Sequence, residues 1–175
     1  MSPLFFEKYM FLRKAIPSDS ERIWEILQDG IESRRLEGSL QWQDGYPNPE
    51  IIVADIQKEI GFVAVENEQI VGYIVIIHGV EEAYNSIDGN WLTNGEYVVL
   101  HRLATAKEFK NQGVATKIMQ LVEESCRKEK IPSIRVDTNF DNAAMLHVFK
   151  KLDYEYCGEV LLRDAPRKAF EKILN

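Results

Sequence analysis

The stretch of the sequence best suited to chemistry is the short segment 110–116, Lys-Asn-Gln-Gly-Val-Ala-Thr. It follows an apolar, β-branched run at 97–105 and precedes a segment whose apolar residues recur at helical spacing. This order predicts a strand, a turn and a helix that starts at Gly113. The first amides of a helix have no acceptor within it and lie at the positive end of its dipole, so the junction is suited to an anion. Many α/β domains begin a helix with glycine and bind nothing there, and the junction alone leaves both interpretations open.

A second unit of the same kind follows at 133–160. An apolar strand again ends in a polar turn, and a helix opens near Asn142 with Met145 and Phe149 on one face. Two such units in succession strengthen the interpretation that the first junction holds phosphate.

Together the two units resemble the GNAT superfamily of N-acetyltransferases, and the resemblance extends over about 9–174. The family's first motif, Arg/Gln-x-x-Gly-x-Gly/Ala, corresponds to residues 110–115. Its second motif corresponds to Asn142, Met145, Phe149, Asp153 and Tyr154. Three positions depart from the common form. Lys110 replaces Arg or Gln and keeps a donor, Asp153 replaces a turn glycine, and Phe149 replaces a tyrosine that many members use as general acid.

The resemblance implies an α/β fold of the mixed α+β kind. It would form a single domain over 1–175, with a mixed sheet of about seven strands and helices on both faces. It also implies acetyl-CoA (CoA) as cofactor, with the pyrophosphate on the amides of 111–116. The implied cofactor contacts are Leu103, Ala104, Thr105, Lys110, Asn111, Gln112, Gly113, Val114, Ala115, Thr116, Asn142 and Phe149. For Asn142, a plain helix-start role is the alternative.

The reaction implied is direct acetyl transfer to a primary amine of a small molecule or peptide, with cofactor and acceptor bound together. A lysine-type amine, with a pKa of about 10.4, is neutral only about once in 2,500 at pH 7, so a base or a desolvating pocket is needed. His101 is the first candidate base, because histidine titrates near neutrality. Glu96 is the second, and Tyr154 is a candidate proton donor. Their structural alternatives are a core histidine, a solvated carboxylate and a packing aromatic.

Two aromatic residues are candidates for the acceptor site. Trp42 lies in a Gly- and Pro-punctuated loop and Tyr84 in the long turn-rich segment 78–95, where Glu81 and Glu82 could also meet a cationic acceptor. The alternatives are that Trp42 plugs the edge of the core and that 78–95 is a solvated surface loop.

Composition narrows the class of protein. With 175 residues and 45% hydrophobic content, one domain is expected. The net charge of −7 and the lack of a basic block argue against nucleic acid as a direct partner. Cys126 and Cys157 form no CxxC pair and indicate reduced thiols in a cytoplasmic protein. The scattered histidines predict no metal, and the start of the chain predicts neither a signal peptide nor a membrane span. A homodimer is compatible with the family.

Periodicity and turn residues predict the remaining elements: a strand at 9–15, a helix after Pro17, a second short helical piece between Gly30 and Gly38, a helix at 51–60, a hairpin of 62–65 with 70–77, and two final strands, the last of them at about 167–173.

Two other functions stay open. A non-catalytic acyl-CoA-binding or regulatory module would explain Phe149. A nucleotide-binding domain ranks last, because the GxxxxGK[ST] spacing is missing.

Overall fold

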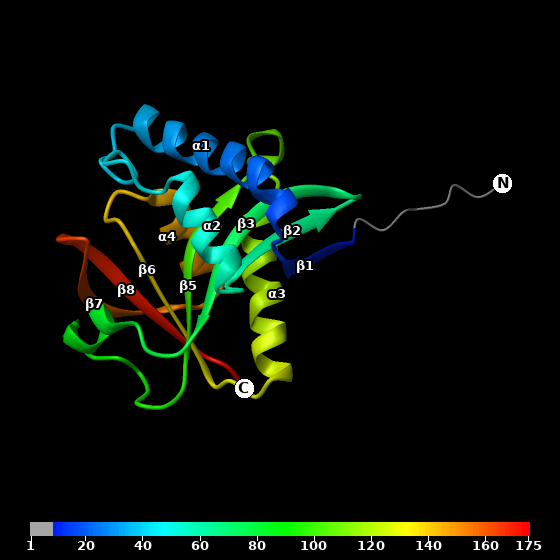
Figure 1. Ribbon diagram of the computed structural model, residues 1–175. Helices are drawn as coiled ribbons and strands as arrows, with labels where there is room; N and C mark the ends of the chain where they lie inside the picture. Colours follow the sequence, from blue (N-terminus) through cyan, green and yellow to red (C-terminus); the bar gives the residue numbers. More distant parts are fainter. Residues whose placement is uncertain (1–8) are drawn as a thin grey trace.

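A computed structural model describes residues 9–175, and within them one mixed sheet of eight strands carries helices on both faces (Figure 1). The strands are β1 (Met10–Lys14), β2 (Gly61–Glu66), β3 (Gln69–His78), β4 (Asp88–Gly89), β5 (Val98–Thr105), β6 (Ser133–Thr138), β7 (Glu155–Leu162) and β8 (Ala165–Ile173). The α-helices are α1 (Ser20–Leu36), α2 (Pro49–Gln57), α3 (Val114–Lys128) and α4 (Ala143–Lys151). Short 3-10 turns are η1 (Pro17–Asp19), η2 (Glu82–Ser86) and η3 (Lys107–Phe109).

The strands lie in the order β1-β2-β3-β5-β6-β8-β7-β4, and only β5 and β6 run parallel. The α/β class and the mixed sheet expected from the sequence are confirmed. The eighth strand is β4, a two-residue strand inside the segment interpreted as a loop. Because it pairs with β7 through close backbone contacts at Gly89 and Gly158, it leaves no periodic pattern to find.

The expectation of two helical pieces around Gly30 is wrong, since α1 continues through Gly30 to Leu36. A Cβ at position 30 would lie 2.9 Å from Cζ3 of Trp42, so this glycine makes room for a ring and does not break the helix. Gly38 does follow the end of α1. It has φ +76°, and the amides of Gly38 and Ser39 donate back to the last turn, which is a helix-ending geometry that favours glycine.

The two faces of the sheet bury separate apolar clusters (Figure 1). Helices α3 and α4 cover one face, where Ile118 and Phe149 pack against strand residues such as Val98 and Ile134. Helices α1 and α2 cover the other face, where Ile26 and Ile52 belong to the cluster.

The two parallel strands at the centre of the sheet separate soon after they meet. β5 pairs with β6 only at Val98 and Val99, so the rest of this edge of β5 has no strand partner. β5 also carries a bulge on its other side. Val75 lies opposite His101 and Tyr73 opposite Ala104, so Arg102 and Leu103 together face one residue of β3. Arg102 takes up the extra residue with φ +51°. The separation opens a gap through the middle of the sheet.

None of the helices in residues 9–175 is both long and apolar enough to cross a bilayer. The prediction made for the first eight residues lies outside the described part of the chain. Cys126 and Cys157 are both buried and form no disulfide.

Candidate active site

A cavity of ≈ 1280 Å³ occupies the place where β5 leaves β6. Its walls come from α1 and the loop after it, from β5 and β6, from the first part of α3, from α4, and from β8. It is lined by residues of both sheet faces, for example Met119 of α3 on one side and His101 and Arg167 on the other. A volume of this size holds a ligand larger than most drug-sized molecules.

One end of the cavity is the start of α3. Gly113 precedes the helix with φ +72°, and no side chain caps the helix start. The first i→i+4 hydrogen bond is donated by Lys117 to Gly113, so the amides of 114–116 have no acceptor within the helix. A Cβ built on Gly113 meets no heavy atom within 4 Å, so the approach to these amides is open. The structure thus leaves room for an anion where the sequence predicted one.

Lysines border this end of the cavity. Lys107 and Lys110 line it, and the Lys110 Nζ donates to Ser33 Oγ at 2.8 Å. Gln112 is not among the lining residues, and its amide is directed back to the carbonyl of Glu108 at 3.4 Å. The other predicted cofactor contacts at this turn, Asn111 and 113–116, all line the cavity.

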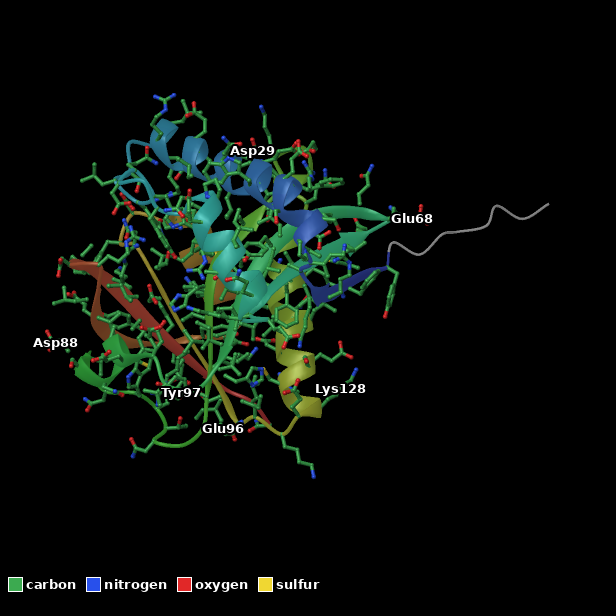
Figure 2. The ribbon with its side chains drawn as sticks, in the orientation of Figure 1. Asp29, Glu68, Asp88, Glu96, Tyr97 and Lys128 are labelled. Atoms are coloured by element: carbon green, nitrogen blue, oxygen red, sulfur yellow. The ribbon has the colours of Figure 1, made fainter. Side chains whose placement is uncertain are left out.

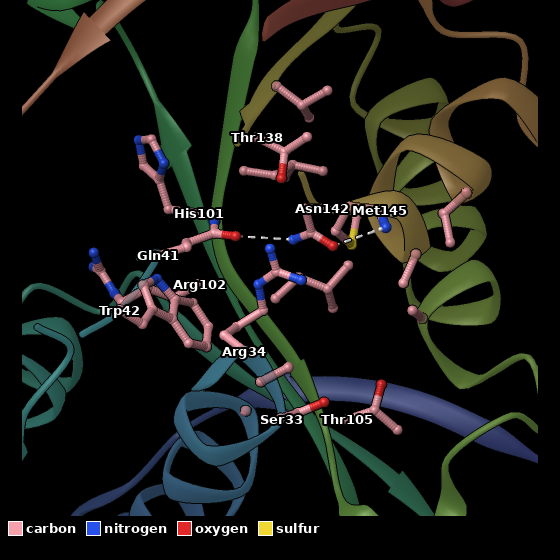
Figure 3. A pocket seen from close by; sticks show the side chains of 18 of the residues that line it. Ser33, Arg34, Gln41, Trp42, His101, Arg102, Thr105, Thr138, Asn142 and Met145 are labelled. Carbon is pink, nitrogen blue, oxygen red and sulfur yellow. Dashed lines mark hydrogen bonds between the residues drawn. The ribbon is translucent and has the colours of Figure 1, made fainter. Parts of the chain in front are cut away.

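The middle of the cavity runs along the unpaired edge of β5. Leu103, Ala104 and Thr105, which the family resemblance made candidate cofactor contacts, line it. Asn142 also lines it, and both ends of its side chain have partners (Figure 3). Its Oδ1 accepts from the Met145 amide at 3.2 Å and its Nδ2 donates to Gln41 Oε1 at 3.1 Å. Asn142 therefore caps α4, which is the structural alternative considered above, and ties that helix to the loop after α1.

His101 projects from β5 into the cavity on the α1 and α2 face, and its ring points away from Asn142 (Figure 3). Its Nε2 lies 3.1 Å from Glu81 Oε2. The hydrogen bond from His101 lowers the pKa of Glu81, which keeps that carboxylate ionised and an acceptor only. Nε2 must then carry the hydrogen, and in a neutral imidazole Nδ1 is left with its lone pair.

A buried carboxyl group lies near this pair. Asp137, on β6, accepts a hydrogen bond from Tyr84 Oη at 2.5 Å and lines the cavity. Burial raises the pKa of Asp137, while charge on His101 and the Tyr84 hydrogen bond act in the opposite direction. Asp137 thus adds a second titratable carboxyl group to the cavity that His101 lines.

Tyr46 and Arg102 line another part of the cavity wall. The Arg102 guanidinium donates to both oxygens of Asp55 on α2, with Nε–Oδ2 3.0 Å and Nη2–Oδ1 2.5 Å, and also to Tyr46 Oη. Tyr73 Oη donates to the same carboxylate at 2.6 Å, and burial raises the pKa of Tyr73. This network fixes the bulged part of β5 against α2.

The structure does not bring all the predicted catalytic and substrate residues together. Glu96 is exposed just before β5, at the end of the molecule opposite Asp29, which lines the cavity (Figure 2). Tyr154 is buried outside the cavity, beside Phe149 with ring centroids 5.7 Å apart. Tyr84 is fully buried and reaches the site only through Asp137. Trp42 and Phe149 do line the cavity.

The site also contains residues that the sequence did not suggest for these roles, namely Asp137, Arg102, Arg167 and Glu81 as the partner of His101. For Asp137 a signal existed, because a carboxylate at the end of an apolar strand often lies in a site. The other three come from a loop, a bulge and the last strand, and nothing local marks them.

Comparisons with known proteins agree with the geometry. Residues 22–154 match the model of the acetyltransferase (GNAT) family, which is more than half of the chain. An uncharacterized N-acetyltransferase of Bacillus subtilis (strain 168), YesJ, is 27% identical over 148 residues, which cover 82% of this chain and 81% of that protein.

Solved structures give the same result. The crystal structure of a GNAT family acetyltransferase from Streptococcus agalactiae 2603 is similar, with a TM-score of 0.88 and 34% identity over 97% of this chain and 99% of the other. A GNAT family acetyltransferase from Listeria monocytogenes 4b F2365 shares the fold, with a TM-score of 0.74 at 18% identity, covering 94% of this chain and 95% of the other.

Proposed function

Because this chain belongs to the acetyltransferase (GNAT) family and is an N-acetyltransferase, we propose that it transfers an acetyl group from acetyl-CoA directly to a primary amine of a small molecule or peptide. In this proposal the cofactor and the acceptor are bound at the same time. The observation that carries it is the separation of β5 from β6, since one continuous cavity joins the open start of α3 to His101 across the sheet.

The residues present fit CoA. The amides of 114–116 lack helical acceptors and Gly113 leaves them accessible, which suits a pyrophosphate, with Lys107 and Lys110 adding positive charge. The unpaired edge of β5 offers peptide groups for the amides of a pantetheine arm. When bound, acetyl-CoA would supply a thioester whose thiol, with an ordinary pKa of about 8.5, leaves readily as thiolate.

His101 is proposed as the base that takes the proton from the attacking amine. Glu81 holds Nε2 at 3.1 Å, so Nδ1 is the atom available to accept the proton. The Glu81 carboxylate then stabilises the imidazolium that forms. A backbone amide on the unpaired edge of β5 near Leu103 is proposed to donate to the oxygen that becomes negative during attack.

Neither Phe149 nor Tyr154 supplies the missing general acid. Phe149 is 2% exposed among other aromatic rings and has no proton to give, and the Tyr154 hydroxyl lies outside the cavity. Tyr154 and Glu96 both lie outside the cavity and are therefore not part of the proposed catalytic machinery.

The cofactor site is tested by replacing Gly113 with aspartate or asparagine. The two side chains have nearly the same shape and both tolerate positive φ, so only the added charge differs. Saturating acetyl-CoA at about 100 times its dissociation constant adds about 2.7 kcal/mol, which should raise the unfolding midpoint of a domain this size by about 5–10 °C.

Thermal unfolding with and without acetyl-CoA gives the readout. We expect the native chain and Gly113→Asn to be stabilised and Gly113→Asp to bind about tenfold more weakly or worse, because its carboxylate opposes the pyrophosphate. Equal stabilisation of the Asp and Asn variants would place the pyrophosphate elsewhere. No stabilisation of the native chain would remove the cofactor assignment itself.

A further inference from the structure

Arg167 is a buried cation in the wall of the cavity. It lies on β8, is 7% exposed, and is one of the lining residues. Its Nη1 donates to the neutral side chain of Asn139 at 2.5 Å, while its Nε is buried without any hydrogen-bond partner. A guanidinium has five N–H donors, so much of its capacity to bind a ligand remains free.

The other arginines that line the cavity differ from Arg167, because each forms an ion pair. Arg102 pairs with Asp55 at 2.5 Å, Arg163 with Asp44 at 2.8 Å, and Arg34 with Asp141 at 2.8 Å. Within residues 9–175, no carboxylate oxygen lies within 4.0 Å of the Arg167 guanidinium.

The charges around Arg167 do not replace that missing partner. Burial lowers the pKa of Arg167, the charge on Asp137 acts to raise it, the charge on Arg163 lowers it, and Tyr46 and Asp44 act more weakly to raise it. Asp137, however, accepts its hydrogen bond from Tyr84 and makes none with Arg167. A buried charge without a partner costs free energy, and proteins normally pair such groups. Because residues 9–175 provide no such partner, a bound ligand is expected to supply the counter-ion.

The position of Arg167 indicates which ligand would bring it. Asp137 pairs with Ala169 on β8, and Arg167 is two residues before Ala169, so all three lie on one face of the sheet. His101 lines the same cavity, and its charge also acts on Asp137. The proposed pyrophosphate site lies at the start of α3, which packs on the other face. Arg167 thus belongs to the acceptor side of the cavity.

We infer that the acceptor amine also carries a carboxylate, and that Arg167 binds this carboxylate while the amine lies at His101. The inference rests on the proposed function and names its substrate class. The cationic acceptor considered from the sequence has less support, because Glu81 is occupied by His101, Tyr84 is buried, and Glu82 is exposed outside the cavity.

The test compares each acceptor with its own amide. Free amino acids and their primary amides are offered with acetyl-CoA to the native chain, Arg167→Gln, Arg167→Lys and Lys168→Gln, and initial rates of CoA release give kcat and KM. The acid-to-amide ratio of kcat/KM is compared between variants, so that differences in amine reactivity cancel. Lys168→Gln is the matched control, since it also removes one positive charge from β8 but at a position outside the cavity.

We expect the acid-to-amide ratio to fall about ten- to a hundredfold in Arg167→Gln, mainly through a higher KM for the acid, because a charge-assisted hydrogen bond is lost. Arg167→Lys should recover part of the ratio, and Lys168→Gln should leave it unchanged. Peptides that begin with aspartate or glutamate form a second arm, which distinguishes a peptide carboxylate from that of a free amino acid. An unchanged ratio in Arg167→Gln, or a native preference for amides, would overturn the inference.

A binding measurement separates failure of this inference from failure of the proposed function. Unfolding midpoints are recorded with CoA alone and with CoA plus each acid or amide. Stabilisation of Arg167→Gln by CoA as in the native chain, with acids and amides then adding equally to both, would leave the cofactor site intact and reject the carboxylate subsite. A native chain that CoA does not stabilise would reject the proposed function, and the inference with it.

Discussion

His101→Gln is expected to lower kcat by about a hundred- to ten-thousandfold, with little change in the binding of acetyl-CoA. This is the range that a positioned general base contributes. Glutamine keeps a polar side chain near Glu81 but cannot accept the amine proton at neutral pH. The measurement is the rate of CoA release with an amine that the native chain accepts, together with the stabilisation by acetyl-CoA.

His78→Gln is the matched control, because His78 is exposed at the end of β3 and does not line the cavity. Its kcat should stay within about twofold of the native value, as for most surface substitutions. Glu81→Gln should have an effect intermediate between the two, since it removes the negative charge that stabilises the imidazolium but keeps an oxygen that can accept from Nε2. If His101→Gln retained more than about a tenth of the native kcat, His101 would not be the base.

Glu171→Ala is expected to give the largest loss of stability, about 3–5 kcal/mol, because it leaves a buried arginine without its partner. Glu171 is 0% exposed. Its carboxylate accepts from Ser133 Oγ at 2.5 Å, from Thr93 Oγ1 at 2.5 Å and from Arg135 Nε at 3.3 Å. It therefore holds the segment before β5 against the sheet. Chemical denaturation of both proteins gives the difference in unfolding free energy.

Glu155→Ala is the control, since Glu155 is paired with Glu171 in the β7–β8 register but is exposed. Its unfolding free energy should stay within about 0.5 kcal/mol of the native value. A loss below about 1 kcal/mol for Glu171→Ala would contradict the role assigned to this cluster.

The pH dependence of the unfolding free energy, compared between the native chain and Glu171→Ala, gives an independent check. Burial raises the pKa of Glu171, but the hydrogen bonds from Ser133 and Thr93 and the charge of Arg135 lower it more, to below its ordinary value of 4.5. A carboxyl group whose pKa is lowered by folding stabilises the protein above its unfolded pKa, and this stability is lost as the pH falls through the folded pKa. The unfolding free energies of the native chain and Glu171→Ala should therefore differ most above about pH 4.5 and converge in more acidic solution.

Much of the fold, and the open helix start proposed for the cofactor, could be predicted from the sequence, because their signals are local. The turn at 110–116 and the helix after it lie within one continuous segment, and the φ of +72° at residue 113 favours glycine. The hairpin of β2 and β3 is likewise a local feature. Errors occurred where packing overrode a local signal, as at Gly30, which makes room for Trp42 and does not end α1.

The positions of the catalytic candidates along the strand show why the sequence alone could not distinguish those that reach the cavity from those that do not. Glu96 and His101 are five residues apart, so at about 3.3 Å per residue they are some 16 Å apart along the strand direction. Only the structure shows that the cavity opens at the His101 end, where β6 has left β5. Tyr154, close in sequence to Phe149, is buried against it outside the cavity.

The sequence by itself determined the two strand-turn-helix units, the helix start that is proposed to bind the pyrophosphate and, through them, the family. The tertiary structure alone decided that Glu81 pairs with His101, that Asp137 lines the same cavity with Tyr84 as its buried partner, and that Arg167 lines it without a carboxylate partner in residues 9–175. The physical reason is the distance along the chain over which the interactions act. Helix starts, turns and periodicity depend on neighbours in the chain, whereas the charge and hydrogen bonding of the acceptor site depend on which distant segments the sheet order places side by side.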